Sequence, residues 1–291
     1  MTRTVTEHTR TIGHRTIGAI GMGCAAMSLA GPTRDEALGV IHAALDAGVR
    51  MLDAAAAYTP DLASTGHNER LLSQAVRTWT GPREDVVIAT KGGHRRVRDG
   101  LTLDAFQVCG RPDALRVDVE ASLAALGSDR IELYYLHWPD PEVPIAESVG
   151  ALEDLRREGK VGMVGLSNVT VEQLQQAVTA GRIDAVQNKF SPTATDSRPV
   201  IEWCERNGAT FVAYSPLGGG AARVLEHAPA FGVVADARGL SVQRVVLAWE
   251  LAQSHALVPI PGCRRIESVA DSTAAMSLHL TVDELRTLDV P

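Results

Sequence analysis

The chain has 291 residues, 45% of them hydrophobic and 22% charged, and its 28 basic and 35 acidic residues give a formal net charge of −7. This length suits one α/β barrel, while the acidic balance argues against a nucleic-acid-binding protein, which would carry a basic stripe. Residues 1–13 lack an apolar leader, and no apolar run in the sequence is long enough to span a membrane. We therefore expect a cytoplasmic protein without a membrane partner.

The four cysteines are scattered along the chain and form no C-x-x-C pair: Cys24, Cys109, Cys204 and Cys263. Zinc and redox motifs bring cysteines together at such short spacings, so the pattern predicts neither a metal site nor a redox centre. Free thiols in a reducing compartment are the expected state.

Short apolar runs typical of strands alternate with segments of helical periodicity. Residues 9–23 predict a hairpin that leads into a first barrel strand at residues 17–22. Thr33 is the expected N-cap of the next helix, with Glu36 placed to complete a capping box, and Gly48 ends that helix. Further strands are expected at residues 49–53, 86–91, 131–137, 161–167, 185–188, 210–214 and 257–260.

Helical segments separate these strands at short intervals. They are expected at residues 68–77, 111–126, 145–158, 171–180, 198–206, 223–238, 241–254, 266–274 and 282–288. Such alternation implies parallel strands joined by right-handed crossovers, and eight units in 291 residues favour a closed barrel. The predicted fold is a (β/α)8 TIM barrel with an N-terminal β-hairpin, forming a single domain over residues 1–291. The longest segment without predicted structure is 92–110, at the carboxyl end of a strand, where barrels usually determine substrate specificity.

Four polar residues stand where strands of the predicted barrel end. Asp53, Lys91 and His137 each directly follow an apolar run, and Tyr58 lies in the loop beyond Asp53. Because the carboxyl ends of parallel strands meet at one face of a barrel, we expect these side chains to converge. An acid, a phenol, an amine and an imidazole in one cleft form a proton-transfer site.

This set of residues suits hydride transfer to a carbonyl group, whose oxygen becomes an alkoxide that must be protonated. Tyr58 would be the acid, and the Lys91 ammonium would lower its pKa from the usual value near 10. Asp53 would hold Lys91, and His137 would donate a hydrogen bond that orients the carbonyl oxygen.

Each residue taken alone has a structural alternative. Asp53 could cap a turn, Tyr58 could pack on the rim, Lys91 could be a solvated charge and His137 a satisfied core histidine. Their joint occurrence on the second, third and fourth strands favours the catalytic interpretation.

Sequence blocks around these residues then indicate a family. The segment LDAAAAY at residues 52–58 resembles the D-x-A-x-x-Y signature of the aldo-keto reductase family. Four further blocks resemble conserved-type blocks of that family in the same order: ATKGG at 89–93, DRI to LHWPDP at 129–141, REGKV to GLSN at 157–168, and AYSPLG at 213–218. The resemblance implies a barrel that binds NADP(H) without a Rossmann domain, and no G-x-G-x-x-G follows a strand here.

The resemblance also implies how the cofactor is bound. Ser167, Asn168 and Gln187 would bind the nicotinamide carboxamide, and Tyr214 would stack on the ring. The loop from Ser215 onward would approach the pyrophosphate, where glycines permit close backbone contact, although glycines alone could simply make a flexible loop. The predicted cofactor contacts are Gly23, Cys24, Asp53, Ser167, Asn168, Gln187, Tyr214, Ser215, Pro216, Leu217, Gly219, Gly262, Arg264 and Arg265.

The adenosine end of the predicted site departs from many relatives, which place Lys-Ser after the Ile-Pro of the last strand and an Arg further on. Here Gly262-Cys263-Arg264-Arg265 follow, and Ser268 stands where the later Arg would be. Arg264 and Arg265 could clasp a 2′-phosphate at a helix N-terminus, or they could be a solvated pair. The expected cofactor is NADPH, with NADH as an alternative.

The substrate pocket is expected to be wide. Ala25 and Ala26 leave room where other branches of the family place a tryptophan, and Trp138 is the expected aromatic wall. The predicted substrate contacts are Trp138 and Ala26.

The leading prediction is an NADPH-dependent reductase of small-molecule aldehydes or ketones, present as a monomer or weak homo-oligomer. A regulatory barrel that binds NADP(H) without significant turnover is one alternative. A lyase or aldolase that uses Lys91 as a Schiff base is another.

Overall fold

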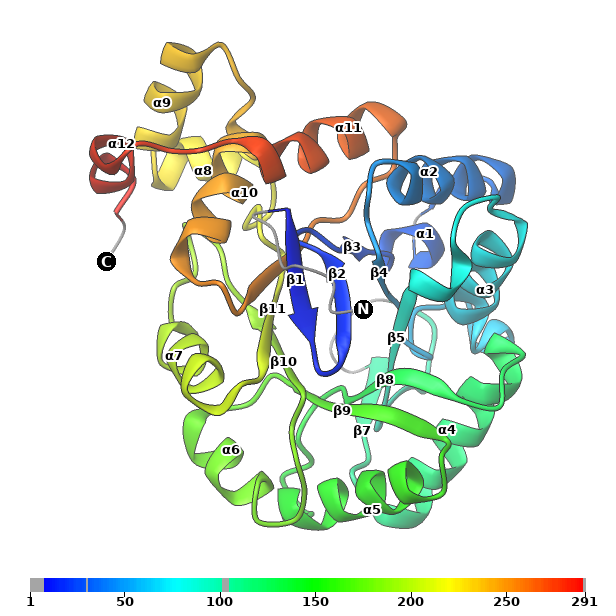
Figure 1. Ribbon diagram of the computed structural model, residues 1–291. Coiled ribbons are helices and arrows are strands. Elements are labelled where there is room, and N and C mark those ends of the chain that lie inside the picture. The colour runs from blue at the N-terminus through cyan, green and yellow to red at the C-terminus, as the bar shows by residue number, and fades with distance from the viewer. Residues whose placement is uncertain (1–7, 30, 101–104, 290–291) are drawn as a thin grey trace.

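The computed structural model describes residues 8–29, 31–100 and 105–289 of the chain (Figure 1). Eight parallel strands form a barrel in which each strand pairs with its neighbours along the chain. A parallel bridge between Gly23 and Gly262 joins the first strand to the last and closes it. The strands are β3 (Met22–Gly23), β4 (Met51–Asp53), β5 (Val87–Gly92), β8 (Ile131–Leu136), β9 (Val161–Ser167), β10 (Ala185–Lys189), β11 (Thr210–Tyr214) and β12 (Leu257–Ile260). The expected barrel is confirmed.

Helices surround the barrel on its outside (Figure 1). They are α1 (Ala26–Leu29), α2 (Arg34–Asp46), α3 (His67–Thr78), α4 (Pro112–Leu126), α5 (Ile145–Arg157), α6 (Val171–Ala177), α7 (Arg198–Asn207), α8 (Ala221–His227), α9 (Ala230–Arg238), α10 (Val242–Gln253), α11 (Ile266–Ala274) and α12 (Val282–Thr287), with short 3-10 turns at Leu62–Ser64, Arg83–Asp85 and Ala275–Ser277. As expected, Thr33 is the N-cap of α2, and its backbone N–H donates to Glu36 Oε2 at 2.8 Å. Among the described residues, none of these helices has the length and apolar character that a membrane crossing requires.

An antiparallel hairpin, β1 (Thr9–Ile12) and β2 (Arg15–Gly18), lies across one end of the barrel (Figure 1). Its side chains Ile12 and Ile17 are buried in one cluster with Leu133 and other barrel-interior residues. The expected first barrel strand at residues 17–22 is therefore wrong, because Ile17 belongs to the hairpin and the barrel strand is only Met22–Gly23. The apolar run is divided between two buried environments, which periodicity alone cannot separate.

The segment at residues 92–110, expected to lack structure, contains a second antiparallel hairpin, which corrects that prediction. Its strands are β6 (His94–Arg96) and β7 (Phe106–Val108), while residues 101–104 lie outside the described part. Asp118 of α4 holds this hairpin by accepting hydrogen bonds from the Gly93 backbone N–H at 2.9 Å and Arg95 Nε at 2.8 Å. The anchor Asp118 lies on the following helix, 25 residues from Gly93 in the chain, so no local pattern reveals it.

The helix expected at residues 223–238 is divided into α8 and α9. Pro229 stands at the break, where it cannot donate a backbone hydrogen bond and restricts the conformation of the preceding Ala228. Ala228 accordingly has φ −142° and ψ 65°, outside the helical region.

Candidate active site

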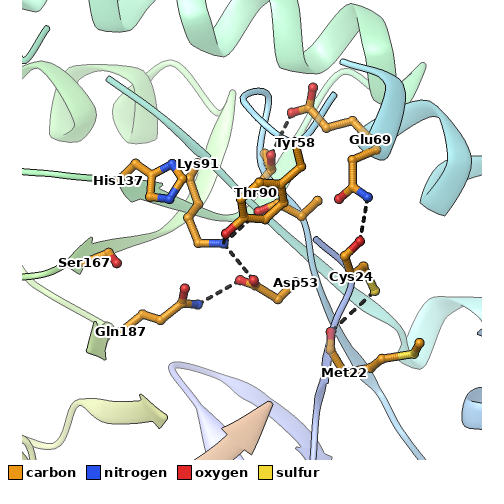
Figure 2. A network of polar contacts seen from close by, with 12 residues as sticks. Met22, Cys24, Asp53, Tyr58, Glu69, Thr90, Lys91, His137, Ser167 and Gln187 are labelled. Carbon is orange, nitrogen blue, oxygen red and sulfur yellow. Dashed lines mark hydrogen bonds and ion pairs between the residues drawn. The ribbon is translucent and has the colours of Figure 1, made fainter. Parts of the chain in front are cut away.

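Side chains from three neighbouring strands and one loop converge at the carboxyl-terminal end of the barrel. Asp53 ends β4, Lys91 lies in β5, His137 directly follows β8 and Tyr58 lies in the loop after β4. Parallel register sets this convergence, because it pairs Asp53 with Ala89 and Lys91 with Tyr135 across adjacent strands. Figure 2 shows Tyr58 and His137 on either side of the Lys91 side chain.

Lys91 is the centre of the group. Its Nζ donates to Asp53 Oδ2 at 2.7 Å, to the Ala54 carbonyl at 2.9 Å and to the Tyr58 hydroxyl at 3.4 Å. The lysine and the aspartate are both buried, with 0% and 3% of their side-chain surfaces exposed. The ammonium also lies 5.0 Å from the Tyr58 ring centroid. The four residues predicted to act together are thus placed together.

Burial and charge set the protonation states of these groups. Burial alone would lower the pKa of Lys91, but the Asp53 carboxylate and the Tyr58 oxygen raise it above its usual value, so the amine stays an ammonium. Burial raises the pKa of Tyr58 although Lys91 acts in the opposite direction. Lys91 lowers the pKa of Tyr58 as expected, but burial outweighs this effect, so the pKa lies above its usual value.

His137 is an uncharged imidazole in this setting. Burial lowers its pKa well below the usual value, and the positive charge of Lys91 lowers it further. Only 7% of the residue is exposed. A neutral histidine keeps one N–H donor and one acceptor nitrogen, which suits a group that donates a hydrogen bond without transferring a charge.

A pocket of about 310 Å³ opens beside these residues. It is lined by Gly23, Ala25, Ala26, Asp53, Tyr58, His137, Trp138, Ser167, Asn168, Gln187, Tyr214, Ser215, Ile260 and Gly262. A larger hollow of about 800 Å³, between the N-terminal hairpin and α11, contains none of the four converging residues, so size alone does not mark the site. Among the described residues, no group of three or more His, Cys, Asp or Glu side chains could hold a metal ion.

The amide of Gln187 connects the predicted nicotinamide side of this pocket to the group of Asp53, Lys91 and Tyr58. Its Nε2 donates to Asp53 Oδ1 at 2.8 Å, while Lys91 is bound to the other oxygen of the same carboxylate (Figure 2). One of the two N–H donors of Gln187 is thus bound within the protein, while its Oε1 can accept a hydrogen bond from a carboxamide.

Asn168 and Tyr214 form the opposite wall. The Tyr214 hydroxyl donates to Asn168 Oδ1 at 2.8 Å, and Asn168 Nδ2 donates to Ser167 Oγ and to the His137 carbonyl, both at 3.0 Å. Asn168 has φ 60° and Ser215 has φ 51°, the two positive φ values among the described non-glycine residues. Both residues lie at strand ends that border the pocket, and such backbone strain is characteristic of functional sites.

The loop after β11 supplies the glycine-rich segment. Gly218, Gly219 and Gly220 all have positive φ and precede α8. A Cβ on Gly218 would stand 2.3 Å from Thr193 Oγ1, so only glycine fits there. Ser215 lines the pocket, whereas the predicted contacts Pro216, Leu217 and Gly219 lie further along this loop and are not part of the pocket lining.

The remaining predicted cofactor contacts lie near the closing seam of the barrel. Gly23 and Gly262 line the pocket, and a Cβ on Gly23 would stand 2.9 Å from the Ile260 carbonyl oxygen. Cys24 is fully buried in the core, where its thiol donates to the Met22 carbonyl at 3.5 Å, so its side chain does not face the pocket. Arg264 and Arg265 are exposed at the start of α11, and neither forms an ion pair with a described residue.

The two predicted substrate contacts, Trp138 and Ala26, both line the pocket, and 40% of the Trp138 surface is exposed at its rim. Sequence reasoning missed three residues of the second hairpin that lie beside the site. His94 and Phe106 stack on each other, and Arg96 Nη1 donates to the Thr59 carbonyl next to Tyr58. Their only signal was position, since all three stand in the long segment that follows Lys91.

Comparison with known proteins identifies the family of this chain. The model of the aldo/keto reductase family matches residues 19–290. The aldo-keto reductase yakc [NADP(+)] of Schizosaccharomyces pombe is 30% identical over 96% of this chain and 90% of its own. A crystal structure of an aldo/keto reductase from Klebsiella pneumoniae in complex with NADP and acetate has a TM-score of 0.81 and 27% identity, covering 98% of this chain and 95% of that one. A Klebsiella pneumoniae aldo-keto reductase in complex with NADPH has a TM-score of 0.80 and 26% identity, with the same coverage.

The family model covers most of the chain, and one relative is 30% identical over nearly the whole of it. The chain therefore belongs to the aldo/keto reductase family of NAD(P)H-dependent oxidoreductases.

Proposed function

We propose that the protein reduces aldehydes or ketones to alcohols with NADPH, and that Tyr58 donates the proton. The observation that carries the proposal is the buried hydrogen-bonded row from Gln187 through Asp53 and Lys91 to Tyr58, beside the pocket that His137 also lines. When bound, the nicotinamide supplies the hydride that the protein itself lacks.

Tyr58 would act as the acid because it keeps its proton. Burial raises the pKa of its hydroxyl, so the group is protonated at neutral pH and can release the proton when an alkoxide develops beside it. Lys91 lies 3.4 Å from the hydroxyl oxygen and stabilises the phenolate left behind. Asp53 keeps Lys91 charged and in place.

His137 would orient the carbonyl group. Its neutral imidazole lines the pocket next to Tyr58, with the ring centroids 5.8 Å apart at 86°. A donor at this position can stabilise the negative charge that develops on the oxygen, while Tyr58 supplies the proton.

The pocket fits a nicotinamide. Asn168 Oδ1 and Gln187 Oε1 can accept hydrogen bonds from the carboxamide amino group, the Ser167 hydroxyl can donate to its carbonyl, and the Tyr214 ring borders the same space. The positive-φ glycines of the loop after β11 would let the backbone approach the pyrophosphate. Arg264 and Arg265 would bind the 2′-phosphate of NADPH, since guanidinium forms paired hydrogen bonds with phosphate. A cytoplasmic location and a monomeric or weakly associated state stay predictions.

Tyr58→Phe tests the acid. The variant keeps the ring but removes the hydroxyl, so the rate of NADPH oxidation with 4-nitrobenzaldehyde should fall by roughly 100-fold or more, because general acid catalysis contributes that much. NADPH affinity, measured by fluorescence, should change by less than about twofold, since the hydroxyl is not part of the proposed cofactor contacts.

The same assay separates the three candidate functions. Wild-type protein that binds NADPH but oxidises it with no aldehyde or ketone would support the regulatory barrel. Borohydride trapping of a carbonyl substrate on Lys91 without nicotinamide would support the lyase, although the raised pKa of Lys91 opposes the neutral amine that a Schiff base needs. A Tyr58→Phe variant with most of its activity would refute the acid assignment.

Arg264→Ala tests the cofactor preference. Loss of a guanidinium–phosphate contact should raise the KM for NADPH about 10-fold and leave the KM for NADH unchanged, because only NADPH carries the 2′-phosphate. Arg206→Ala, at an exposed arginine on α7, is the control. Equal effects of Arg264→Ala on the two cofactors would show that this arginine does not select between them.

A further inference from the structure

The second hairpin places another histidine against His137. The His94 ring centroid lies 4.9 Å from that of His137, with the two planes at 81°. The other side of His94 is occupied as well, since its ring stacks on Phe106 at 5.0 Å and 20° and lies 6.3 Å from the Trp138 ring. His137 is thus held in an aromatic cluster of residues from the hairpin and from the end of β8.

The residues on both sides of His94 are anchored to different parts of the protein. Asp118 of α4 accepts hydrogen bonds from the Gly93 backbone N–H and from the Arg95 guanidinium. Arg96 donates to the carbonyl oxygen of Thr59, which is buried and follows Tyr58 directly. The short strand β6 therefore spans from the Tyr58 loop to His137 and fixes the position of His94 between them.

His137 lacks the hydrogen bond that usually fixes a catalytic imidazole. In most such sites one ring nitrogen bonds to a carboxylate or carbonyl, which sets the tautomer and the rotation of the ring. Here His137 Nδ1 is buried without a hydrogen-bond partner among the described residues. The terminal torsion of histidine has a broad energy profile, so this ring needs another restraint.

We propose that His94 is a positioning residue, whose ring sets the orientation of the His137 imidazole by aromatic contact in place of a hydrogen bond. The inference rests on the proposed carbonyl reduction, in which His137 must direct its free N–H toward the substrate oxygen. His94 does not touch substrate or cofactor in this assignment, because it is not part of the pocket lining.

Two substitutions at His94 distinguish the contribution of the flat ring from that of its nitrogen atoms. His94→Ala removes the ring contact and should lower kcat by ~10- to 100-fold, since small misplacements of a catalytic group cost that much. His94→Phe keeps a flat ring and should restore kcat to within about threefold of wild type. NADPH affinity should stay unchanged in both, and Gln107→Ala, at an exposed position on β7, is the matched control.

A readout that needs no turnover keeps this inference distinct from the proposed function. Histidine-ring NMR, with the His137 signals identified by their loss in His137→Gln, should show one sharp set of His137 ring signals in wild type and His94→Phe, and signals broadened by exchange between ring orientations in His94→Ala. If His94→Ala does not fold, His94→Leu takes its place, because leucine fills the space without a flat ring.

Three results would overturn the inference. One is a folded His94→Ala variant with wild-type kcat and an unchanged His137 spectrum. Another is His94→Phe that is as impaired as His94→Ala, which would mean that a nitrogen atom is required. The third is a loss of NADPH affinity in parallel with kcat, which would indicate general disruption of the site.

Discussion

At the scale of single residues, the site combines a lysine that stays charged with a tyrosine that stays protonated. Lys91 is buried, yet Asp53 keeps it an ammonium, and Tyr58 is buried enough to keep its hydroxyl proton despite that neighbour. In the proposed mechanism, the direction of reaction would depend on pH through Tyr58. Reduction would need the protonated phenol, whereas oxidation of an alcohol would need the phenolate as a base.

This assignment predicts opposite pH profiles for the two directions. The pKa of Tyr58 is raised above its usual value of 10.0 and that of His137 lies well below 6.5, so kcat/KM for reduction should be flat between about pH 7 and 9. Reduction should decline only as pH rises through the pKa of Tyr58, while oxidation should increase toward it. Steady-state rates in both directions, measured in overlapping buffers, check this. A fall in kcat/KM for reduction that begins near pH 7 would contradict the assignment of Tyr58.

The residues at strand ends could be predicted from the sequence because each follows a recognisable apolar run. The resulting protonation states could not, because the balance between burial and charge depends on contacts such as the one between Gln187 and Asp53, 134 residues apart in the chain. The same holds for His94, which lies only three residues after Lys91 but acquires its neighbours through Asp118.

At the scale of elements, the pocket is lined by the ends of the barrel strands and by the loops that follow them. The predicted strands after the first agree with β4, β5 and β8 to β12 to within a few residues, because buried parallel strands are marked by continuous apolar runs. The two-residue strand β3 and the hairpin of β6 and β7 were not predictable, because strands of two or three residues are too short to show a periodic pattern. The loop after β11 contains three consecutive glycines with positive φ, Gly218, Gly219 and Gly220.

Gly218→Ala tests that constraint. Gly218 has φ 57°, and an added Cβ would stand 2.3 Å from Thr193 Oγ1, so the loop must shift. We expect weaker NADPH binding, by about 10-fold, and a free energy of unfolding lower by roughly 1–2 kcal/mol. Fluorescence titration and denaturant unfolding measure the two effects.

The matched control for this substitution is Gly39→Ala. Gly39 lies inside α2, where an added Cβ meets nothing within 4 Å. Alanine is the better helix former, so this variant should be more stable by about 1 kcal/mol and bind NADPH normally. Unchanged NADPH binding in Gly218→Ala would remove the loop after β11 from the cofactor site.

At the scale of the whole molecule, one buried acid opposes the stability of the fold. Glu250 of α10 is fully buried, and neither carboxyl oxygen has a hydrogen-bond partner among the described residues. Burial raises its pKa well above the usual 4.5. The folded state thus keeps a proton that the unfolded chain releases, and stability falls as pH rises from about 4.5 toward the pKa of the folded state.

Glu250→Gln should therefore stabilise the protein in a pH-dependent way. The gain in free energy of unfolding should be near zero at about pH 4 and reach on the order of 1–3 kcal/mol at pH 7, because only the wild type has a carboxyl group to ionise. Glu284→Gln is a control of opposite sign, since Arg238 holds the pKa of Glu284 down to about 2 and its contribution is lost as pH falls. Denaturant unfolding at both pH values measures these differences, and a pH-independent gain for Glu250→Gln would contradict the account.

The barrel itself was predictable because eight alternations of strand and helix leave few other arrangements. The boundary between the N-terminal hairpin and the first barrel strand was not predictable, since Ile17 and Met22 are both apolar and both buried. The single domain over residues 1–291 stays a prediction.

The seam between β3 and β12 is held by few backbone contacts. The first strand is two residues long, and its link to the last depends on the bridge of Gly23 with Gly262 and on hydrogen bonds from Gly21 and Gly23 to the carbonyls of Pro259 and Pro261. Because this pairing is so short, β3 and β12 would separate before the other strands of the barrel during local unfolding. A dinucleotide bound across both glycines would hold the two strands together, so that cofactor binding and closure of the barrel would be thermodynamically coupled.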